Sequence, residues 1–425
     1  MTVPQPAAWR IPLCDLNYDS REEEAVLAVL RSRWLTMGPR TEEFEARVAD
    51  YLGVRHAVAV ASGTCALELA YAFALRRFRE QGGHGHIPAW GIENPYILVP
   101  DVTFVATAAA VLAAGAEPAL VDIERHDRPL LSAAGTAALA ASLGAAAAAV
   151  CAVHYAGYDA LSDGLDAVVA DQRLMLIEDA AHAMGATASD GRKLGTLGLA
   201  GCFSFFSNKN LATGEGGLIA TNDGDLAGFA RLARSHGMTA ATYDRHARGA
   251  QGYDVVLAGH NYRCTEITAA LGLVQLDKLD AANERRRALS RLYRDTLKGT
   301  GIAPVFSDDE AIARSACHIM PVLFESGAAR DRARDALTAA GIQTSHHYPP
   351  IHTFSHYRAM LAASCATGEP DSPRERALLA AGWPAAEDFS TRTLTLPLYP
   401  ALREEQVAEI CAVAADASQR PDTAP

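Results

Sequence analysis

Short apolar runs alternate with helical patterns along the chain from roughly residue 20 to residue 280. The apolar runs are only a few residues long, which is typical of strands that are buried on both faces. Such strands, separated by helices, predict a mostly parallel sheet that is covered on both faces. The predicted strands lie at residues 58–61, 96–99, 119–121, 148–153, 174–177, 203–206 and 218–220, and the clearest helices lie at 65–78 and 104–114.

The pattern changes near residue 300. A long helix is predicted at about 265–297, with a charged second half that forms its solvent face. The apolar stripe of this helix consists of Ile267, Leu271, Val274 and Leu279. After the helix, the sequence predicts a strand at 319–324, a helix at 328–340 that ends at Gly341, an extended segment at 342–348 and a last helix at 404–414. We therefore expect a large α/β domain at residues 1–280 and a smaller C-terminal α+β domain at 281–425.

The composition narrows the class of protein. A chain of 425 residues is too long for one ordinary core, which agrees with two domains. Hydrophobic residues make up 49% and charged residues 21%, and the net charge of −12 argues against a nucleic-acid-binding protein. We expect no membrane segment, because the alanine-rich residues 132–153 fit a helix followed by a buried strand better. Eight scattered cysteines without a Cys-x-x-Cys pair indicate reduced thiols and a cytoplasmic protein.

Two segments carry little regular pattern. Residues 81–95 are rich in Gly and Pro and predict a surface loop, with a lid or a dimer-contact loop near the functional site as the alternative. The polar tail at 418–425 contains two prolines and is expected to be disordered.

Lys209 and Asp179 are the candidate catalytic residues. Lys209 lies just past an apolar strand, and Asp179 ends an earlier strand that finishes in Glu-Asp. This arrangement is typical of a pyridoxal-phosphate enzyme, in which the lysine amine forms a Schiff base with the cofactor and the carboxylate holds the pyridine nitrogen protonated. Neither residue is diagnostic alone, because most lysines are simply surface residues.

Three further motifs fit the same cofactor, and each also has a structural reading. Ser62, Gly63 and Thr64 join a strand to a helix N-terminus, which can seat a phosphate group or can simply cap the helix. Phe104 can stack on a cofactor ring or pack in the core. His182 can bond the cofactor's phenolic oxygen or a substrate hydroxyl, or it can be a buried structural histidine.

A group of histidines lies within and just after the predicted extended segment at 342–348. His352 and His356 have the spacing of metal ligands on a helix, but Pro349 and Pro350 precede them and no Cys or paired carboxylate completes a ligand set. We therefore expect no metal site. The segment that carries His346, His347, Tyr348 and His352 fits a ligand-contacting loop better.

Taken together, these motifs resemble the DegT/StrS family of sugar aminotransferases, which are pyridoxal-phosphate enzymes of fold type I. The resemblance covers nearly the whole chain in the family's order. It rests on LTMGPRTEEFEARVADYLGVRHAVAVASGTCALELA, PDVTFVATAAAVLAAGAEPALVDIE, IEDAAHAMGA, SFFSNKNLATGEGGLIATND, GHNYRCTEITAALGLVQLDKL, YPPIH and LPLYPALREEQVAEI.

The resemblance implies an aspartate-aminotransferase-like fold and a homodimer with shared active sites. Lys209 matches the Schiff-base lysine, Asp179 the partner of the pyridine nitrogen and Phe104 the stacking aromatic. The other matches are Gly63, Thr64 and Ser204 in the phosphate cradle; Asn261 and Arg263, which reach the phosphate of the other subunit; His182 beside the cofactor; and His347, Tyr348 and His352 near the substrate. Three departures concern substrate contacts: His260 and Asp101 stand where an aromatic residue and Ser are usual, and the loop at 81–95 is longer.

The reaction that the resemblance implies moves an amino group from L-glutamate to a nucleotide-linked keto-deoxysugar. Family members that act on a 4-keto sugar often read EDAAHA, and this chain has His182 at that place, so amination at C-4 of a 4-keto-6-deoxyhexose is expected. Residues 235–246 also resemble a loop of 4-aminotransferases. Amination at C-3, amination of a cyclitol ketone, and a cofactor-binding sensor without turnover are the alternatives.

Overall fold

The structure is a computed structural model that describes residues 9–82, 95–240, 252–363 and 382–420. Most of the predicted loop at 81–95, the end of the polar tail, part of the segment at 235–246, and Cys365 lie outside the described residues. The cysteines within the described part are free thiols, and most of them are buried.

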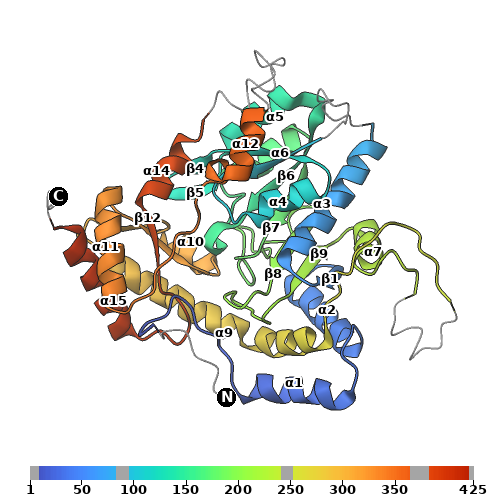
Figure 1. Cartoon of the computed structure of the whole chain (residues 1–425), viewed down its shortest axis with the longest axis horizontal. Helices are drawn as coiled ribbons and strands as arrows, with labels where there is room; N and C mark the ends of the chain where they lie inside the picture. Colours follow the sequence, from blue (N-terminus) through green and yellow to red (C-terminus); the bar gives the residue numbers. More distant parts are fainter. Residues whose placement is uncertain (1–8, 83–94, 241–251, 364–381, 421–425) are drawn as a thin grey trace.

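A seven-stranded sheet forms the centre of the larger part of the molecule (Figure 1). Strand β9 is antiparallel to both of its neighbours, whereas the other contacts in this sheet are parallel, so the prediction of a mostly parallel sheet is confirmed. In spatial order the strands are β1 (His56–Val60), β9 (Gly217–Thr221), β8 (Ala200–Ser204), β7 (Met175–Asp179), β6 (Ala147–Val153), β2 (Tyr96–Pro100) and β3 (Glu117–Val121).

Both faces of this sheet are buried. In β2, Ile97 and Val99 pack into one hydrophobic cluster, while Tyr96 and Leu98 pack into another. Successive strand side chains point to opposite faces, so continuous apolar runs are what a doubly covered sheet requires. The covering helices include α2 (Pro39–Leu52), α3 (Gly63–Glu80), α4 (Ala106–Ala113), α5 (Ala133–Leu143), α6 (Leu165–Asp171) and α7 (Gly224–Ala233).

A second, three-stranded antiparallel sheet lies in the C-terminal part of the chain. It contains β10 (Ala303–Pro304), β11 (Met320–Leu323) and β12 (Thr393–Leu396), and helices α11 (Gly327–Ala339) and α15 (Glu404–Ser418) pack against each other beside it (Figure 1). Other described elements near the two sheets are the antiparallel strands β4 (Ile123–Arg125) and β5 (Arg128–Leu131), the short helices η1 (Gly144–Ala146), η2 (Tyr155–Gly157) and η3 (Ile351–Thr353), and helices α10 (Asp309–Arg314), α12 (Ser355–Ala363) and α14 (Pro384–Arg392).

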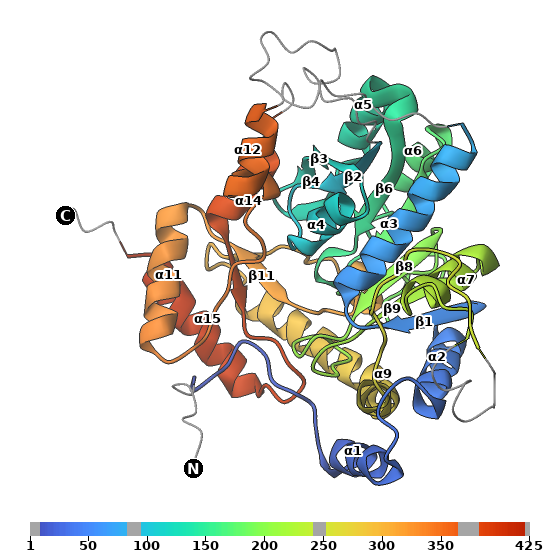
Figure 2. The same ribbon diagram turned by 45° about the vertical axis from the view of Figure 1, so that its right-hand side comes forward.

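Helix α9 (Glu266–Thr296) connects the two regions. It runs through residue 280, where the sequence pattern places the domain boundary, and it packs on α1 (Ser20–Ser32), α2 and α15 (Figure 2). The N-terminal segment lies beside the C-terminal region, because Ile11 bonds the backbone of Gly341 and Arg10 pairs with Glu409. The boundary at 280/281 stays a prediction.

Within the described residues, no helix combines the length and the apolar run that crossing a bilayer would require. The same residues contain no group of three or more His, Cys, Asp or Glu side chains that could hold a metal ion. The cluster of histidines near residue 350 is therefore not arranged as a ligand set in the described part of the chain.

Candidate active site

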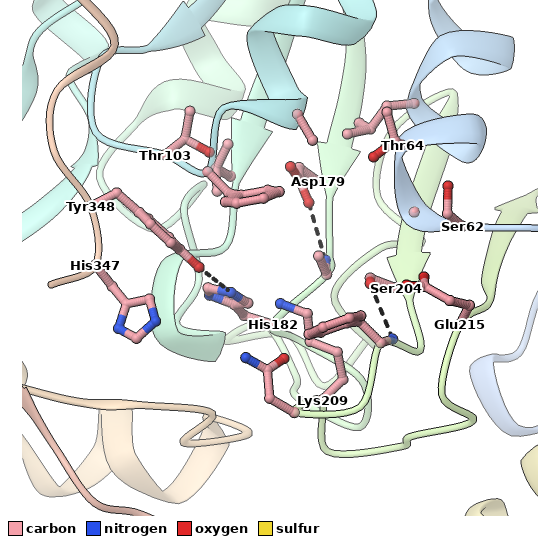
Figure 3. A pocket seen from close by; sticks show the side chains of 18 residues that line it. Ser62, Thr64, Thr103, Asp179, His182, Ser204, Lys209, Glu215, His347 and Tyr348 are labelled. Atoms are coloured by element: carbon pink, nitrogen blue, oxygen red, sulfur yellow. Dashed lines mark hydrogen bonds between the residues drawn. The ribbon is translucent and has the colours of Figure 1, made fainter. Parts of the chain in front are cut away.

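A cavity of about 360 Å³ opens at the carboxyl edge of the large sheet. Asp179 and Ser204 are the last residues of β7 and β8, and α3 begins next to them at Gly63. The carboxyl ends of parallel strands are where open α/β sheets bind their ligands. The cavity brings together ten of the residues that the sequence singled out: Ser62, Gly63, Thr64, Phe104, Asp179, His182, Ser204, Lys209, His347 and Tyr348. Figure 3 labels all of them except Gly63 and Phe104.

Asp179 is the buried acid of this cavity. Its carboxylate accepts a hydrogen bond from Thr107 Oγ1 at 2.8 Å and one from the backbone N–H of Ala181 at 3.2 Å. Thr103 Oγ1 lies 2.8 Å from Thr107 Oγ1 and supports it in turn. Burial raises the pKa of Asp179, although these hydrogen bonds and Lys209 oppose the shift. Because burial disfavours the ionised carboxylate, a cationic partner in the cavity would stabilise that form strongly.

Lys209 enters the same cavity from the turn that follows β8. Its backbone N–H donates to the carbonyl of Phe206 at 2.9 Å, which fixes the turn. Burial lowers the pKa of its amine to about 8, and the charge of Asp179 works against this lowering. A substantial share of the Lys209 amines is therefore neutral near pH 8, which is the form that attacks a carbonyl or accepts a proton.

The N-terminus of α3 forms a tightly built anion seat. Ser62 accepts a hydrogen bond from the N–H of Cys65 and caps the helix. A Cβ on Gly63 would lie 2.8 Å from Ser204 Cβ, and a Cβ on Gly217 would lie 2.3 Å from the carbonyl oxygen of Ser62. The close approach of helix and strands therefore requires glycine at both places. Backbone N–H groups of a helix N-terminus, beside the Ser204 hydroxyl, suit a phosphate group.

Phe104 contributes an exposed ring to the wall of the cavity. It follows β2, is 56% exposed and lines the cavity, and its ring centroid is 5.8 Å from that of Tyr348. An aromatic residue with this exposure is positioned to stack on a planar ligand rather than to fill the core. The phosphate seat, the aromatic ring, the buried carboxylate and the lysine amine thus line one cavity, and they match the phosphate, the ring face, the ring nitrogen and the aldehyde of pyridoxal phosphate.

His182 lies at the floor of the cavity with both ring nitrogens engaged. Nδ1 lies 3.2 Å from the backbone nitrogen of Ala156, and Nε2 lies 3.1 Å from the hydroxyl of Tyr348. Its ring packs against His318 at a centroid distance of 4.3 Å. Burial lowers the pKa of His182 well below the ordinary value for histidine. The side chain is therefore neutral near pH 7.

The predicted substrate residues lie in two places. His347 and Tyr348 line the cavity, and burial lowers the pKa of His347 to about 4. His352 is not among the lining residues. Its Nδ1 lies 2.6 Å from the buried carboxylate of Asp101, which also accepts the backbone N–H of His352 at 2.9 Å. This pair fastens the segment that carries His347 and Tyr348 to the end of β2.

Asn261 and Arg263 do not line the cavity of this chain either. Asn261 forms a backbone bridge to Ser235, and Arg263 donates to Ser235 Oγ at 3.3 Å. Their place is compatible with the expectation that they serve a neighbouring subunit. The role stays a prediction.

The structure adds residues that the sequence did not single out. Thr107 and Thr103 support Asp179, as described above, and Asn208 and Glu215 line the cavity. Glu178, the neighbour of Asp179 on β7, points to the other side of the sheet. Its carboxylate accepts three backbone N–H bonds at 2.7 Å each, from Gly195, Leu197 and Gly198, and a bond with His154 at 2.9 Å. The adjacent Glu178 and Asp179 at the end of β7 could have indicated this role for Glu178. Neighbouring strand residues face opposite sides of a sheet, so only one of the two carboxylates can face the cavity.

Comparison with known proteins identifies similar chains. A model of the DegT/DnrJ/EryC1/StrS aminotransferase family matches residues 17–414. The chain is 31% identical over 397 residues to the spore coat polysaccharide biosynthesis protein SpsC of Bacillus subtilis (strain 168), and 92% of each chain is covered. Among solved structures, DesV of S. venezuelae is 31% identical with a TM-score of 0.77, covering 97% of this chain and 100% of DesV. The pyridoxal-phosphate form of the putative sugar aminotransferase Spr1654 of Streptococcus pneumoniae is 26% identical with a TM-score of 0.80, covering 96% and 98%.

Proposed function

Since the chain belongs to the DegT/DnrJ/EryC1/StrS aminotransferase family, we propose that it moves an amino group from L-glutamate to a nucleotide-linked keto-deoxysugar. It is a pyridoxal-phosphate-dependent sugar aminotransferase with the fold of that family. The observation that carries the proposal is the meeting of Lys209, Asp179 and the α3 phosphate seat in one cavity. We further propose that the enzyme works in the cytoplasm.

The proposed roles follow from the position of each group. Gly63, Thr64 and Ser204 bind the phosphate, and Phe104 covers the ring. When bound, pyridoxal phosphate accepts the electrons of a broken C–H bond, provided that its ring nitrogen is protonated. Asp179, held in place by Thr107, stabilises that proton at the nitrogen.

Lys209 is the proposed proton carrier. Its Nζ removes the proton from the α-carbon of the amino donor and, in the second half of the cycle, returns a proton to the sugar carbon that receives the nitrogen. Its lowered pKa leaves the amine able to accept a proton near neutral to slightly alkaline pH. The second half reverses the first, so one base on one side of the ligand serves both.

The carbon that receives the amino group is the finer part of the proposal. We favour C-4 of a 4-keto-6-deoxyhexose, because His182 replaces the glutamine that family members acting on 3-keto sugars usually carry. His182 lies at the cavity floor beside Tyr348, so it can influence how the sugar is seated.

A substrate comparison tests this choice. We expect the purified enzyme, supplied with glutamate, to aminate a 4-keto-6-deoxy nucleotide sugar at least about tenfold faster in kcat/KM than the matched 3-keto sugar, which corresponds to a difference of about 1.4 kcal/mol between transition states. NMR of the product identifies the aminated carbon. A preference for the 3-keto sugar, or for a cyclitol ketone, would contradict the C-4 choice while leaving aminotransfer intact.

We also propose a homodimer in which Asn261 and Arg263 complete the partner's phosphate site. A mixture of Lys209→Ala and Asn261→Ala proteins, each nearly inactive alone, should recover up to about half of the wild-type activity per heterodimer. One of the two sites then contains both an intact lysine and an intact asparagine.

The matched control mixes Lys209→Ala with Asp179→Ala. Both residues line the same cavity of one chain, so each site of that heterodimer keeps a defect and no activity should return. Subunit exchange is followed with two differently tagged proteins. If exchange occurs and the Asn261 mixture stays inactive, Asn261 does not serve the partner's site.

A further inference from the structure

The proton on His182 has a defined place. The backbone N–H of Ala156 points at Nδ1, at 3.2 Å, and a backbone N–H can only donate. Nδ1 must therefore carry a lone pair, and the single proton of the neutral ring sits on Nε2. The buried position of His182 favours this neutral form, since a charged ring would lose its hydration. His182 is thus a fixed hydrogen-bond donor through Nε2.

The group that receives this proton is Tyr348. Its hydroxyl oxygen lies 3.1 Å from His182 Nε2 and therefore accepts, which leaves the tyrosine's own O–H free to donate elsewhere (Figure 3). In the described part of the chain, His182 is the one hydrogen-bond partner that this hydroxyl has. Tyr348 lines the cavity, and burial raises its pKa, so the O–H keeps its proton near neutral pH.

The residues behind His182 hold the pair in this orientation. His318 packs on the His182 ring at 4.3 Å, and its Nδ1 lies 2.8 Å from Asn210 Oδ1. Asn210 is itself fixed, because its Nδ2 donates to Asn283 and to the carbonyl of Ala316. On the other side, the fully buried Tyr155 meets the Tyr348 ring edge to face at 6.4 Å. The chain therefore fixes the direction in which the Tyr348 hydroxyl can donate.

We propose that Tyr348, and not His182, donates the hydrogen bond to a ligand oxygen in this cavity, and that His182 is a positioning residue that acts through Tyr348. The inference rests on the proposed function and refines the part that the sequence assigns to His182. The acceptor is either the negatively charged phenolic oxygen of the cofactor or an oxygen of the keto-sugar, such as its carbonyl oxygen.

A double-mutant cycle tests the dependence of one residue on the other. We expect Tyr348→Phe and His182→Leu each to lower kcat/KM for the keto-sugar by about tenfold, as the loss of a hydrogen bond of about 1.4 kcal/mol would. In the double variant we expect no further loss beyond about twofold, because residues that act through one contact are not additive. If the two losses multiply instead, His182 acts independently and the proposal is wrong.

A conservative variant separates positioning from packing. His182→Gln offers an oxygen to Ala156 and an N–H to Tyr348, so it should retain most of the wild-type kcat/KM for the same keto-sugar. If His182→Gln loses as much kcat/KM as His182→Leu, an N–H offered to Tyr348 does not support activity and the proposal is wrong. Melting temperatures of all variants identify any that fail to fold. If His182→Leu fails to fold, His182→Gln and Tyr348→Phe still test whether His182 acts through Tyr348.

Spectroscopy on the loaded protein without sugar identifies the acceptor. If Tyr348 donates to the cofactor's phenolic oxygen, Tyr348→Phe shifts the pH midpoint of the cofactor absorbance change, and His182→Leu shifts it in the same direction. If the acceptor is a sugar oxygen, the midpoint stays and the dissociation constant of an unreactive nucleotide-sugar analogue rises in both variants. A Tyr348→Phe protein that changes neither quantity would overturn the proposal. Wild-type protein that aminates no keto-sugar would instead refute the proposed function, and the absorbance titration would still test the hydrogen bond.

Discussion

Replacing Lys209 with alanine should abolish transamination while leaving cofactor binding in place. The α3 seat, the Phe104 platform and the Asp179 carboxylate remain in the variant. The variant loses both the covalent link to the cofactor and the base that moves the proton. We expect a fall in kcat of about a thousandfold or more, in the upper range of what a positioned general base contributes.

Two measurements check this expectation. Absorbance after dialysis reports whether the Lys209→Ala protein still holds pyridoxal phosphate, and single-turnover reaction with glutamate reports the loss of proton transfer. Added methylamine should restore part of the rate, because a small amine can fill the space of the missing side chain. Lys193→Ala is the matched control, since Lys193 lies over the Tyr51 ring and does not line the cavity. A Lys209→Ala protein with a rate near that of the wild type would show that another group is the base.

Asp179→Asn should lower kcat by about a hundredfold or more, a loss of about 2.7 kcal/mol in transition-state stabilisation. An amide cannot hold a proton on the cofactor's ring nitrogen as a carboxylate does. The same substitution should leave the thermal stability of the cofactor-free protein unchanged or raise it. Because burial raises the pKa of Asp179, its charged form destabilises the fold at pH values above that pKa, and a neutral amide removes this effect. The cofactor-free variant should therefore melt at or above the wild-type temperature near pH 7.

Asp171→Asn, at the exposed last residue of α6, is the matched control for the loss of a carboxylate and should change neither quantity. Steady-state kinetics and thermal melts of cofactor-free protein give both numbers. If Asp179→Asn retains activity within a few-fold of the wild type, another residue contacts the ring nitrogen.

Much of the site could be predicted from the sequence because its residues occupy strand ends and the turns that follow them. Asp179, Ser204, Phe104 and Gly63 each follow or end an apolar run, and strands of a parallel sheet bring such positions to one edge. The long helix was predicted within one residue at either end, since its apolar stripe and its N-cap Thr265 are local signals. Helices α1, α2 and α7 and the hairpin of β4 and β5 were not predicted from the pattern.

What the sequence could not provide are contacts between residues far apart in the chain. Nothing local to Thr107 indicates that it bonds Asp179, and nothing local to His318 indicates that it packs on His182. The direction of β9 could not be predicted either, because a short apolar run does not indicate whether a strand is parallel or antiparallel to its neighbours. His352 illustrates the same limit: its engagement with Asp101 depends on a residue at the end of β2.

The glycine contacts around the α3 seat have a consequence for how the protein folds. Gly217 begins β9, which lies between β1 and β8, and it passes directly behind Ser62. The seat therefore exists only after strands from distant parts of the chain have paired, and such long-range pairings form slowly because a long loop must close first. A ligand that binds only the finished arrangement draws the population toward it by mass action. In a growing cell, the supply of vitamin B6 would then influence how much of the newly made chain reaches its folded state.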